Sequence, residues 1–259
     1  MKLTSKQWRK VELIPGWLDY QNAQLLYSIA INSNLNAWGD ILEIGAYYGK
    51  SSALLAYSLK ENEELICIDS FGKFSLAEES ETNSANQNIY YESLSLKRFY
   101  RFYGWATKKK VHALVGLSSK VLPTINKHFR LIHIDGGHTY EDVRFDITNS
   151  INLLNLNGLM VFDDYGNEMW PGVKKAVDEF LLERKLIPIF NLGKLYCVLP
   201  EYSDLFIEKI PRELKGFEVI EKNQNSKLDP LLEVRVVYKQ PKPYPYLYRR
   251  LLTAILSLI

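Results

Sequence analysis

The sequence predicts an α/β protein built on a doubly wound, mostly parallel β-sheet. The chain has 259 residues, of which 47% are hydrophobic and 24% charged, a globular composition that excludes disordered and low-complexity classes. Between about residues 40 and 200, short apolar runs alternate with stretches of helix length and helical periodicity. Strands and helices that alternate in this way are typical of a parallel sheet covered by helices on both faces.

The elements follow in order along the chain. Apolar runs bounded by polar or glycine residues predict strands, and apolar residues at helical spacing predict helices between them. The segments Ile187–Phe190 and Lys194–Leu199 flank Asn191-Leu-Gly193, which predicts a final antiparallel hairpin and seven strands in all. The five preceding strands are expected at Asp40–Ile44, Leu65–Asp69, Val111–Val115, Leu131–Asp135 and Leu159–Asp163. The helices are expected at Tyr20–Ile31, Lys50–Lys60, Ser118–His128, Tyr140–Leu154 and Val173–Glu183.

Three segments fall outside this alternation. Residues 1–200 are expected to form one domain, with an N-terminal helical cap over 1–38. Residues 73–105 are polar and then aromatic, and predict either a lid over the site or a second apolar cluster. Residues 201–259 are a C-terminal extension of unassigned role, whose apolar end follows Arg249-Arg250. That tail is too short to span a bilayer, which leaves a helix packed on the domain, a dimer contact, or an interfacial membrane anchor.

Charge and cysteine content narrow the function classes. The net charge is +2 and the basic residues are scattered, so nucleic acid is not expected as a partner. Cys67 and Cys197 lie far apart in apolar runs and are expected to be buried, reduced thiols. Residues 1–10 contain no apolar core of a secretory signal, which favours a cytoplasmic location.

In a doubly wound sheet, a ligand binds beyond the carboxyl ends of the strands. Gly45 and Gly49 follow the first strand and allow a tight turn before a helix. A phosphate-binding P-loop is excluded because three residues, rather than four, separate these glycines. Asp69 ends the second strand, 20 residues after Gly49, where an acid can accept hydrogen bonds from ribose hydroxyls. A tight turn without a ligand is the alternative.

Carboxylates end two further strands. Asp135 follows the fourth strand, and Asp163 and Asp164 follow the fifth, so they would lie ~4.8 Å apart on neighbouring strands. Three such carboxylates repel one another unless a cation lies among them, and oxygen ligands favour Mg²⁺, with Mn²⁺ or Ca²⁺ as alternatives. The competing interpretation is that these acids cap helices. His138 lies in the same loop as Asp135 and is a candidate general base, whereas His133 is expected in the core.

Four motifs together resemble class I S-adenosylmethionine (SAM)-dependent methyltransferases. They are Glu43-Ile-Gly-x3-Gly-Lys-Ser-Ser, Ile134-Asp-Gly-Gly-His-x-Tyr140, Val161-Phe-Asp-Asp-Tyr165 and Pro171-Gly-Val-Lys-Lys-Ala176. The resemblance runs from about Pro15 to Pro200 and is closest to the small-molecule O-methyltransferases that include the macrocin and mycinamicin sugar enzymes. It implies a Rossmann-like sheet and methyl transfer from SAM to a hydroxyl of a small molecule or glycan.

The resemblance also assigns roles to residues. Glu43, Gly45 and Gly49 would line the methionine end of the cofactor, Asp69 would hold the ribose, and the segment at Ser118 would border the adenine. The implied Mg²⁺ ligands are Asp135, Asp163 and Asp164, and the implied base is His138. The residues implied to bind the cofactor are Glu43, Gly45, Tyr47, Gly49, Ser51, Asp69, Ser118 and Asp135. A metal-dependent hydrolase would use the same acids but would leave the glycine turn and Asp69 unexplained. A non-catalytic membrane-surface or assembly module is the other alternative, and a homo-oligomer stays open.

Overall fold

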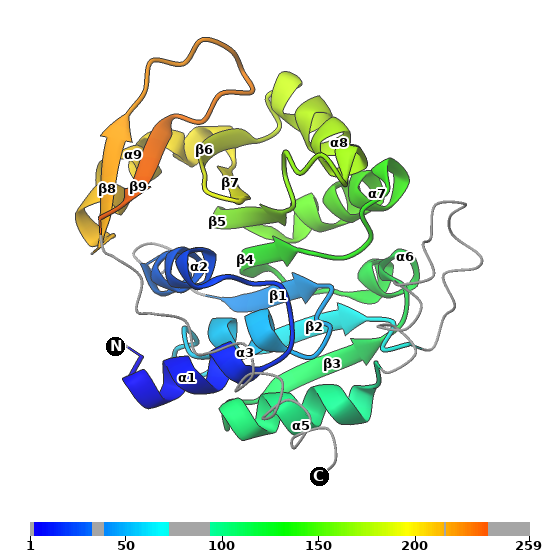
Figure 1. Cartoon of the computed structure of the whole chain (residues 1–259). Helices are drawn as coiled ribbons and strands as arrows, with labels where there is room; N and C mark the ends of the chain where they lie inside the picture. Colours follow the sequence, from blue (N-terminus) through cyan, green and yellow to red (C-terminus); the bar gives the residue numbers. More distant parts are fainter. Residues whose placement is uncertain (1–2, 33–38, 73–93, 215, 238–259) are drawn as a thin grey trace.

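A computed structural model describes residues 3–32, 39–72, 94–214 and 216–237 (Figure 1). It confirms the predicted seven-stranded sheet, in the order β3-β2-β1-β4-β5-β7-β6. β1 to β5 pair in parallel, and β7 runs antiparallel to both of its neighbours, as the hairpin prediction requires. The strands are β1 Asp40–Ile44, β2 Leu65–Asp69, β3 Val111–Val115, β4 Phe129–Ile134, β5 Leu154–Asp163, β6 Ile187–Asn191 and β7 Lys194–Val198.

The order of the strands reverses between β1 and β4. The chain builds β1, β2 and β3 outward on one side, then returns to place β4 and β5 on the other side of β1. Helices that leave the carboxyl ends of β1 and β4 therefore diverge to opposite faces, and this opens a crevice at those ends. The predicted site residues lie around this reversal point.

Helices cover both faces of the sheet (Figure 1). The apolar core on one face is formed with α1 Ser5–Leu13, α2 Tyr20–Asn32, α3 Lys50–Ala56 and α5 Leu96–Ala106. The core on the other face is formed with α7 Tyr140–Ser150 and α8 Pro171–Leu182, beside the short α6 Ser118–Val121. This is the doubly wound arrangement that the sequence predicts.

Several element boundaries differ from the prediction. The helix expected over Ser118–His128 ends after one α-helical turn and a 3₁₀ turn, because Pro123 has no N–H to continue it. β5 begins at Leu154, five residues early, where a shift of register on β4 lets it pair with Phe129. α1 was not predicted, although Thr4 and Gln7 form a capping box at its start.

The aromatic part of the segment 73–105 is a core helix. Phe99, Phe102 and Tyr103 on α5 are buried against the helices of the same face, which matches the alternative of a second apolar cluster. Residues 73–93 lie outside the described part, so a lid over the site stays a prediction for them.

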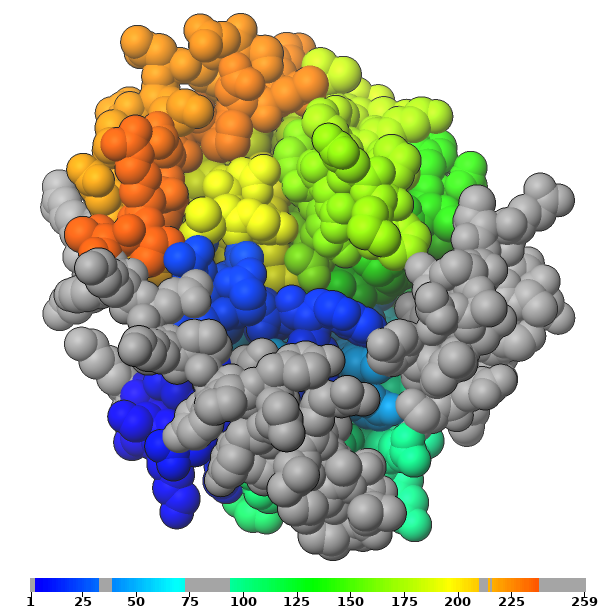
Figure 2. Space-filling view, viewed as in Figure 1, coloured from blue at the N-terminus to red at the C-terminus, as the bar shows by residue number. Residues whose placement is uncertain are grey.

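The described part of the C-terminal extension packs on the domain. It contains α9 Ser203–Glu213 and the antiparallel pair β8 Phe217–Glu221 and β9 Leu232–Val236. Phe206, Leu232 and Val234 join the same core as α2, and the backbone N–H of Leu231 donates to the carbonyl of Pro188 on β6 (3.1 Å). In Figure 2 this extension forms one continuous surface with the neighbouring domain. The apolar tail lies outside the described residues. Among the helices that are described, none has the length and hydrophobicity to cross a membrane.

Candidate active site

One row of residues crosses a single face of the sheet at one edge, where four parallel strands have their carboxyl ends and the antiparallel β7 begins. The pairing of neighbouring strands sets the order of these residues. Asp163 pairs with Lys194, the backbone N–H of Asp135 donates to a carbonyl of β1, and the backbone N–H of Gly45 donates to a carbonyl of β2. The row runs Asp69, Gly45, Asp135, Asp163, Lys194. Four of these residues are predicted site residues, and the structure brings them together. Lys194 is an addition that the sequence did not indicate.

The turn after β1 needs its first glycine for two reasons. Gly45, Tyr47 and Gly49 all have positive φ (84°, 48° and 86°), a region that favours glycine. A Cβ at Gly45 would also lie 1.8 Å from the carbonyl oxygen of Asp135 on the neighbouring loop. The turn then leads into α3, which begins at Lys50. The first backbone N–H groups of this helix have no side-chain cap. These N–H groups suit the carboxylate of a ligand's methionine end.

Asp69 holds this turn in place. Its Oδ2 accepts from the backbone N–H groups of Ala46 and Tyr47 (2.8 Å each), and its Oδ1 accepts from Phe71 (2.7 Å). Burial raises the pKa of Asp69, while these three donors act in the opposite direction. The carboxylate therefore anchors the turn to the end of β2, and its contact with a ribose stays a prediction.

Glu43 lies beneath the turn rather than along a cofactor surface. It is 0% exposed, its Oε1 is 3.1 Å from His133 Nδ1, and its Oε2 accepts from Ser52 Oγ. Burial would raise the pKa of Glu43, but His133 and the serine hydroxyls outweigh it and lower the pKa. The buried His133 confirms the prediction of a core histidine. Ser51 is also buried, so both residues support the turn from below in this structure.

The N-terminal segment covers the outer side of the turn. The ring of Tyr47 lies 5.2 Å from that of Trp17 and 4.3 Å from that of Tyr48. Lys50 Nζ donates to the carbonyl of Gly16 (3.3 Å). Trp17 itself is 77% exposed, so an aromatic surface extends from the turn into solvent.

A buried ammonium lies between the acids of β4 and β5. Lys194 is 2% exposed, and its Nζ lies 2.6 Å from Asp163 Oδ1 and 3.9 Å from Asp135 Oδ2. Although burial opposes ionisation, the charge of Lys194 lowers the pKa of Asp163 to about 2. Burial and the negative charge of Asp163 raise the pKa of Asp135 well above its usual range. The charges in this cluster are therefore compensated by the protein itself.

His138 and Asp164 form a second polar pair beside this cluster. His138 Nε2 lies 3.1 Å from Asp164 Oδ2, and Asn167 Nδ2 donates to Asp164 Oδ1 (2.8 Å). The His138 contact, followed by burial acting in the opposite direction, leaves the pKa of Asp164 below its usual value. The ring of His138 stacks on Trp170 at 4.6 Å and 24°. Both members of the pair remain partly exposed, so a ligand can reach them.

The structure does not support the predicted magnesium site at Asp135, Asp163 and Asp164. Within the described ranges, no group of three His, Cys, Asp or Glu side chains is arranged to hold a metal ion. Asp163 is paired with Lys194, and Asp164 is turned toward His138 and Asn167. A cation does lie among the acids, as their mutual repulsion requires, and it is the ammonium of Lys194.

Ser118 is the first residue of α6 and lies beside a buried acid. Asp146 on α7 is 0% exposed, and a Cβ at Gly136 would lie 3.4 Å from its Oδ2. Burial raises the pKa of Asp146 to about 7, although the nearby hydroxyl of Ser118 acts in the opposite direction. Asp146 thus lies behind the loops where the resemblance places the adenine.

This raised pKa predicts a pH-dependent stability. Because folded Asp146 holds its proton up to about pH 7, the folded state binds more protons than the unfolded state between about pH 4 and 7, and stability falls as the pH rises. In Asp146→Asn this loss is absent. We expect the unfolding free energy of the variant to gain roughly 2–3 kcal/mol over the parent chain between pH 5 and pH 8. Urea unfolding at several pH values measures it, and the exposed Asp204→Asn is the control. A pH-independent difference would contradict the prediction.

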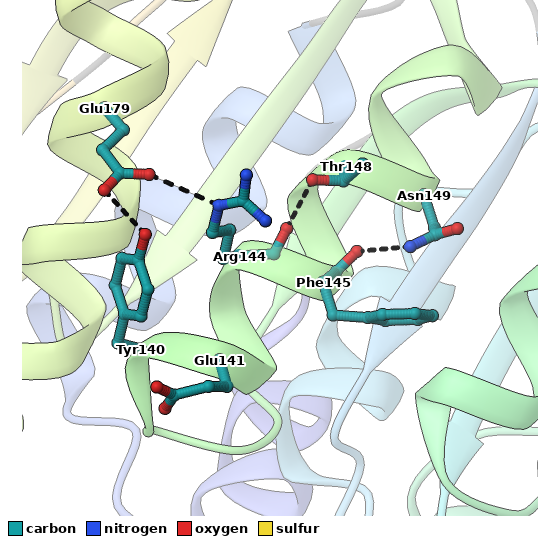
Figure 3. A pocket seen from close by; sticks show the side chains of 7 residues that line it. All are labelled: Tyr140, Glu141, Arg144, Phe145, Thr148, Asn149 and Glu179. Atoms are coloured by element: carbon teal, nitrogen blue, oxygen red, sulfur yellow. Dashed lines mark hydrogen bonds and ion pairs between the residues drawn. The ribbon is translucent and has the colours of Figure 1, made fainter.

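A surface pocket of about 650 Å³ lies outside this site (Figure 3). It is on the outer surface of α7, next to α8, where Tyr140 and Arg144 both contact Glu179 (2.7 and 3.4 Å). The lining residues are Tyr140, Glu141, Arg144, Phe145, Thr148, Asn149 and Glu179, and none of the predicted site residues is among them.

Comparison with known families decides the class. Residues 42–165 match the family model described as "Methyltransferase domain". These residues form a methyltransferase domain. The match begins in β1 and ends just after Asp164, so it contains the glycine turn, Asp69, Asp135 and His138. It confirms the resemblance to class I methyltransferases and the prediction of a SAM-dependent methyltransferase. In a comparison with curated proteins, no sequence matches this chain significantly.

Solved structures share the fold of the methyltransferase domain. The O-methyltransferase NovP is 23% identical over 68% of this chain and 77% of its own, with a TM-score of 0.53. TomG from Streptomyces achromogenes, involved in tomaymycin synthesis and solved with SAM, is 18% identical over 76% of this chain and 91% of its own (0.50). An O-methyltransferase from Bacillus cereus, solved with S-adenosylhomocysteine, is 14% identical over 76% of this chain and 92% of its own, with a TM-score of 0.51. At these identities the likeness concerns the fold.

Proposed function

We propose that this methyltransferase transfers the methyl group of SAM to a hydroxyl oxygen of a small molecule or sugar, with His138 as general base. The observation that carries the proposal is the His138–Asp164 pair, which is partly exposed and lies in the same crevice as the glycine turn and Asp69. A hydroxyl is a poor nucleophile until its proton is removed, so an oriented base is what O-methylation requires of the protein.

The geometry assigns a role to each nitrogen of His138. Nε2 lies 3.1 Å from Asp164 Oδ2 without the alignment of a hydrogen bond, and a negative charge at this distance favours the tautomer with the proton on Nε2. Nδ1 is then the atom that takes the proton from the acceptor hydroxyl. The stacked ring of Trp170 restricts rotation of the imidazole and forms one wall beside it. Asp164 stabilises the imidazolium that results.

The reaction balances without a further reactant. When bound, SAM supplies an electrophilic methyl group on a good leaving group. The acceptor oxygen forms a bond to the methyl carbon, the carbon–sulfur bond breaks with its electron pair on sulfur, and His138 holds the released proton. The chain has to align the acceptor oxygen with the methyl group, and we assign this task to the glycine turn and to Trp170, which stacks on His138.

Calorimetric titration with S-adenosylhomocysteine tests the cofactor, with NAD⁺ as the control ligand. We expect micromolar binding of the first and none of the second, because the turn lacks the spacing of dinucleotide-binding motifs. Methyl transfer from labelled SAM to sugars, phenols and polyketide alcohols then tests the acceptor, with matched amines and thiols as controls. Transfer to nitrogen or sulfur with no transfer to oxygen would contradict the proposal, as would a folded sample that does not bind S-adenosylhomocysteine.

The expected partners complete the proposal. They are a hydroxyl acceptor of small-molecule or glycan type and no nucleic acid, in keeping with the scattered charge. A cytoplasmic location, a homo-oligomer and a membrane contact through the apolar tail stay predictions. A metal-dependent hydrolase has lost its main support, since the acids that it would use are paired with Lys194 and His138.

A further inference from the structure

The acids of β4 and β5 are held by a lysine that reaches them from a third strand. β7 runs antiparallel to β5, and Asp163 pairs directly with Lys194, so both side chains point to the same face of the sheet. The next position on this face of β7 is Tyr196, which is fully buried and whose ring packs against that of Phe190 with the centroids 4.5 Å apart. The stem of Lys194 therefore begins in rigid core, and its ammonium has a fixed position beside the acids.

This ammonium takes the place that a divalent ion would need. An Mg²⁺ ion binds carboxylate oxygens at about 2.0–2.1 Å and requires them to converge on one point. Asp163 Oδ1 is instead 2.6 Å from Lys194 Nζ, and Asp135 Oδ2 is 3.9 Å from the same atom. A divalent ion between these two acids would lie within a few ångströms of a fixed positive charge that has almost no contact with solvent to screen it.

We propose that Lys194 replaces a divalent metal in this site: its ammonium holds Asp135 and Asp163 in position, and the protein neither binds nor requires a metal ion there. Lys194 is a positioning residue, because its contacts are to Asp135 and Asp163 and both of these acids remain partly exposed at the crevice. The inference deepens the proposed function, since it concerns the same site. Its first test is independent of methyl transfer.

Mn²⁺ binding followed by electron paramagnetic resonance is that test. We expect the wild-type chain to leave the signal of free Mn²⁺ unchanged at micromolar concentrations. Lys194→Met keeps the length of the side chain, removes the charge and leaves Asp135 and Asp163 without their cation. We therefore expect it to bind Mn²⁺ at least about tenfold more tightly, and Lys194→Met combined with Asp163→Asn to lose that gain. Lys174→Met is the matched control, because Lys174 also pairs with a carboxylate, Asp178, but on the surface of α8.

The outcomes separate this inference from the proposed function. Saturable Mn²⁺ binding to the wild-type chain that Asp163→Asn abolishes would overturn the role of Lys194, whether or not an acceptor has been found. If Lys194→Met fails to fold, the wild-type measurement alone still decides. Once an acceptor is known, EDTA treatment should change the wild-type rate by less than about twofold, and Lys194→Arg should retain more activity than Lys194→Met because it keeps the charge. Loss of activity in EDTA that Mg²⁺ restores would overturn the inference.

Discussion

The His138→Ala variant is expected to lose 10²- to 10⁴-fold in kcat, the usual contribution of a positioned general base. The physical reason is the position of the ring, which stacks on Trp170 with Nε2 3.1 Å from Asp164 and leaves Nδ1 to take the hydroxyl proton. Binding of S-adenosylhomocysteine should be unchanged, because the base acts on the acceptor rather than on the cofactor. Initial rates with the acceptor and calorimetry with S-adenosylhomocysteine measure the two effects.

His112→Ala is the matched control for this variant. His112 also pairs with a carboxylate, at 3.1 Å from Glu64, but it lies near the start of β3, far along the sheet from the carboxyl ends. We expect its rate to equal that of the wild-type chain. Asp164→Asn should lower kcat less than His138→Ala, because it weakens the orientation of the ring but keeps the base. A loss below threefold in His138→Ala would remove this residue from the catalytic role.

Gly45→Ala is expected to have the largest effect on the fold. A Cβ at this position would lie 1.8 Å from the carbonyl oxygen of Asp135, and neither backbone can move without breaking the bonds between β1 and β4. The φ of +84° adds the strain of a left-handed conformation. We expect a destabilisation of more than about 4 kcal/mol, or failure to fold, and at least a tenfold loss of S-adenosylhomocysteine affinity in any folded fraction. Urea unfolding and calorimetry measure these effects.

The Gly166→Ala variant separates the strain of a positive φ from the steric clash with Asp135. Gly166 has nearly the same φ, +85°, but a Cβ there would meet no atom within 4 Å. Its substitution should cost only the conformational term of about 1–2 kcal/mol. The difference between the two variants is then the cost of the close approach between the turn and Asp135. Equal destabilisation of both would show that the turn has room to move, contrary to the structure.

The sequence located the strand ends well because each apolar run stops at a polar residue. Asp69, Asp135 and Asp163 each mark the point where a buried strand reaches the edge of the sheet, and this local signal was enough to place them in one crevice. The helix expected over Ser118–His128 is wrong for an equally local reason, because Pro123 has no N–H with which to continue it.

Lys194 could not be found by the same reasoning. Its place beside Asp163 depends on which strand the hairpin joins and in which register, and neither follows from local propensity. Only the step from Gly193 into an apolar run hinted that Lys194 begins a buried strand. The repulsion among Asp135, Asp163 and Asp164 predicted a positive charge between them, which we expected to be a bound Mg²⁺ ion. The structure does contain a positive charge at this place, and Lys194 of the chain itself provides it.

The hairpin of the C-terminal extension has a consequence for assembly. β6 is the last strand of the main sheet, and a free last strand is a template on which a second chain can add its own strand. Here Pro188 offers no N–H to such a partner, and its carbonyl is already taken by the N–H of Leu231. The extension therefore blocks the growth of the sheet at this border. If copies of the chain associate, they do not do so by continuing the main sheet at β6.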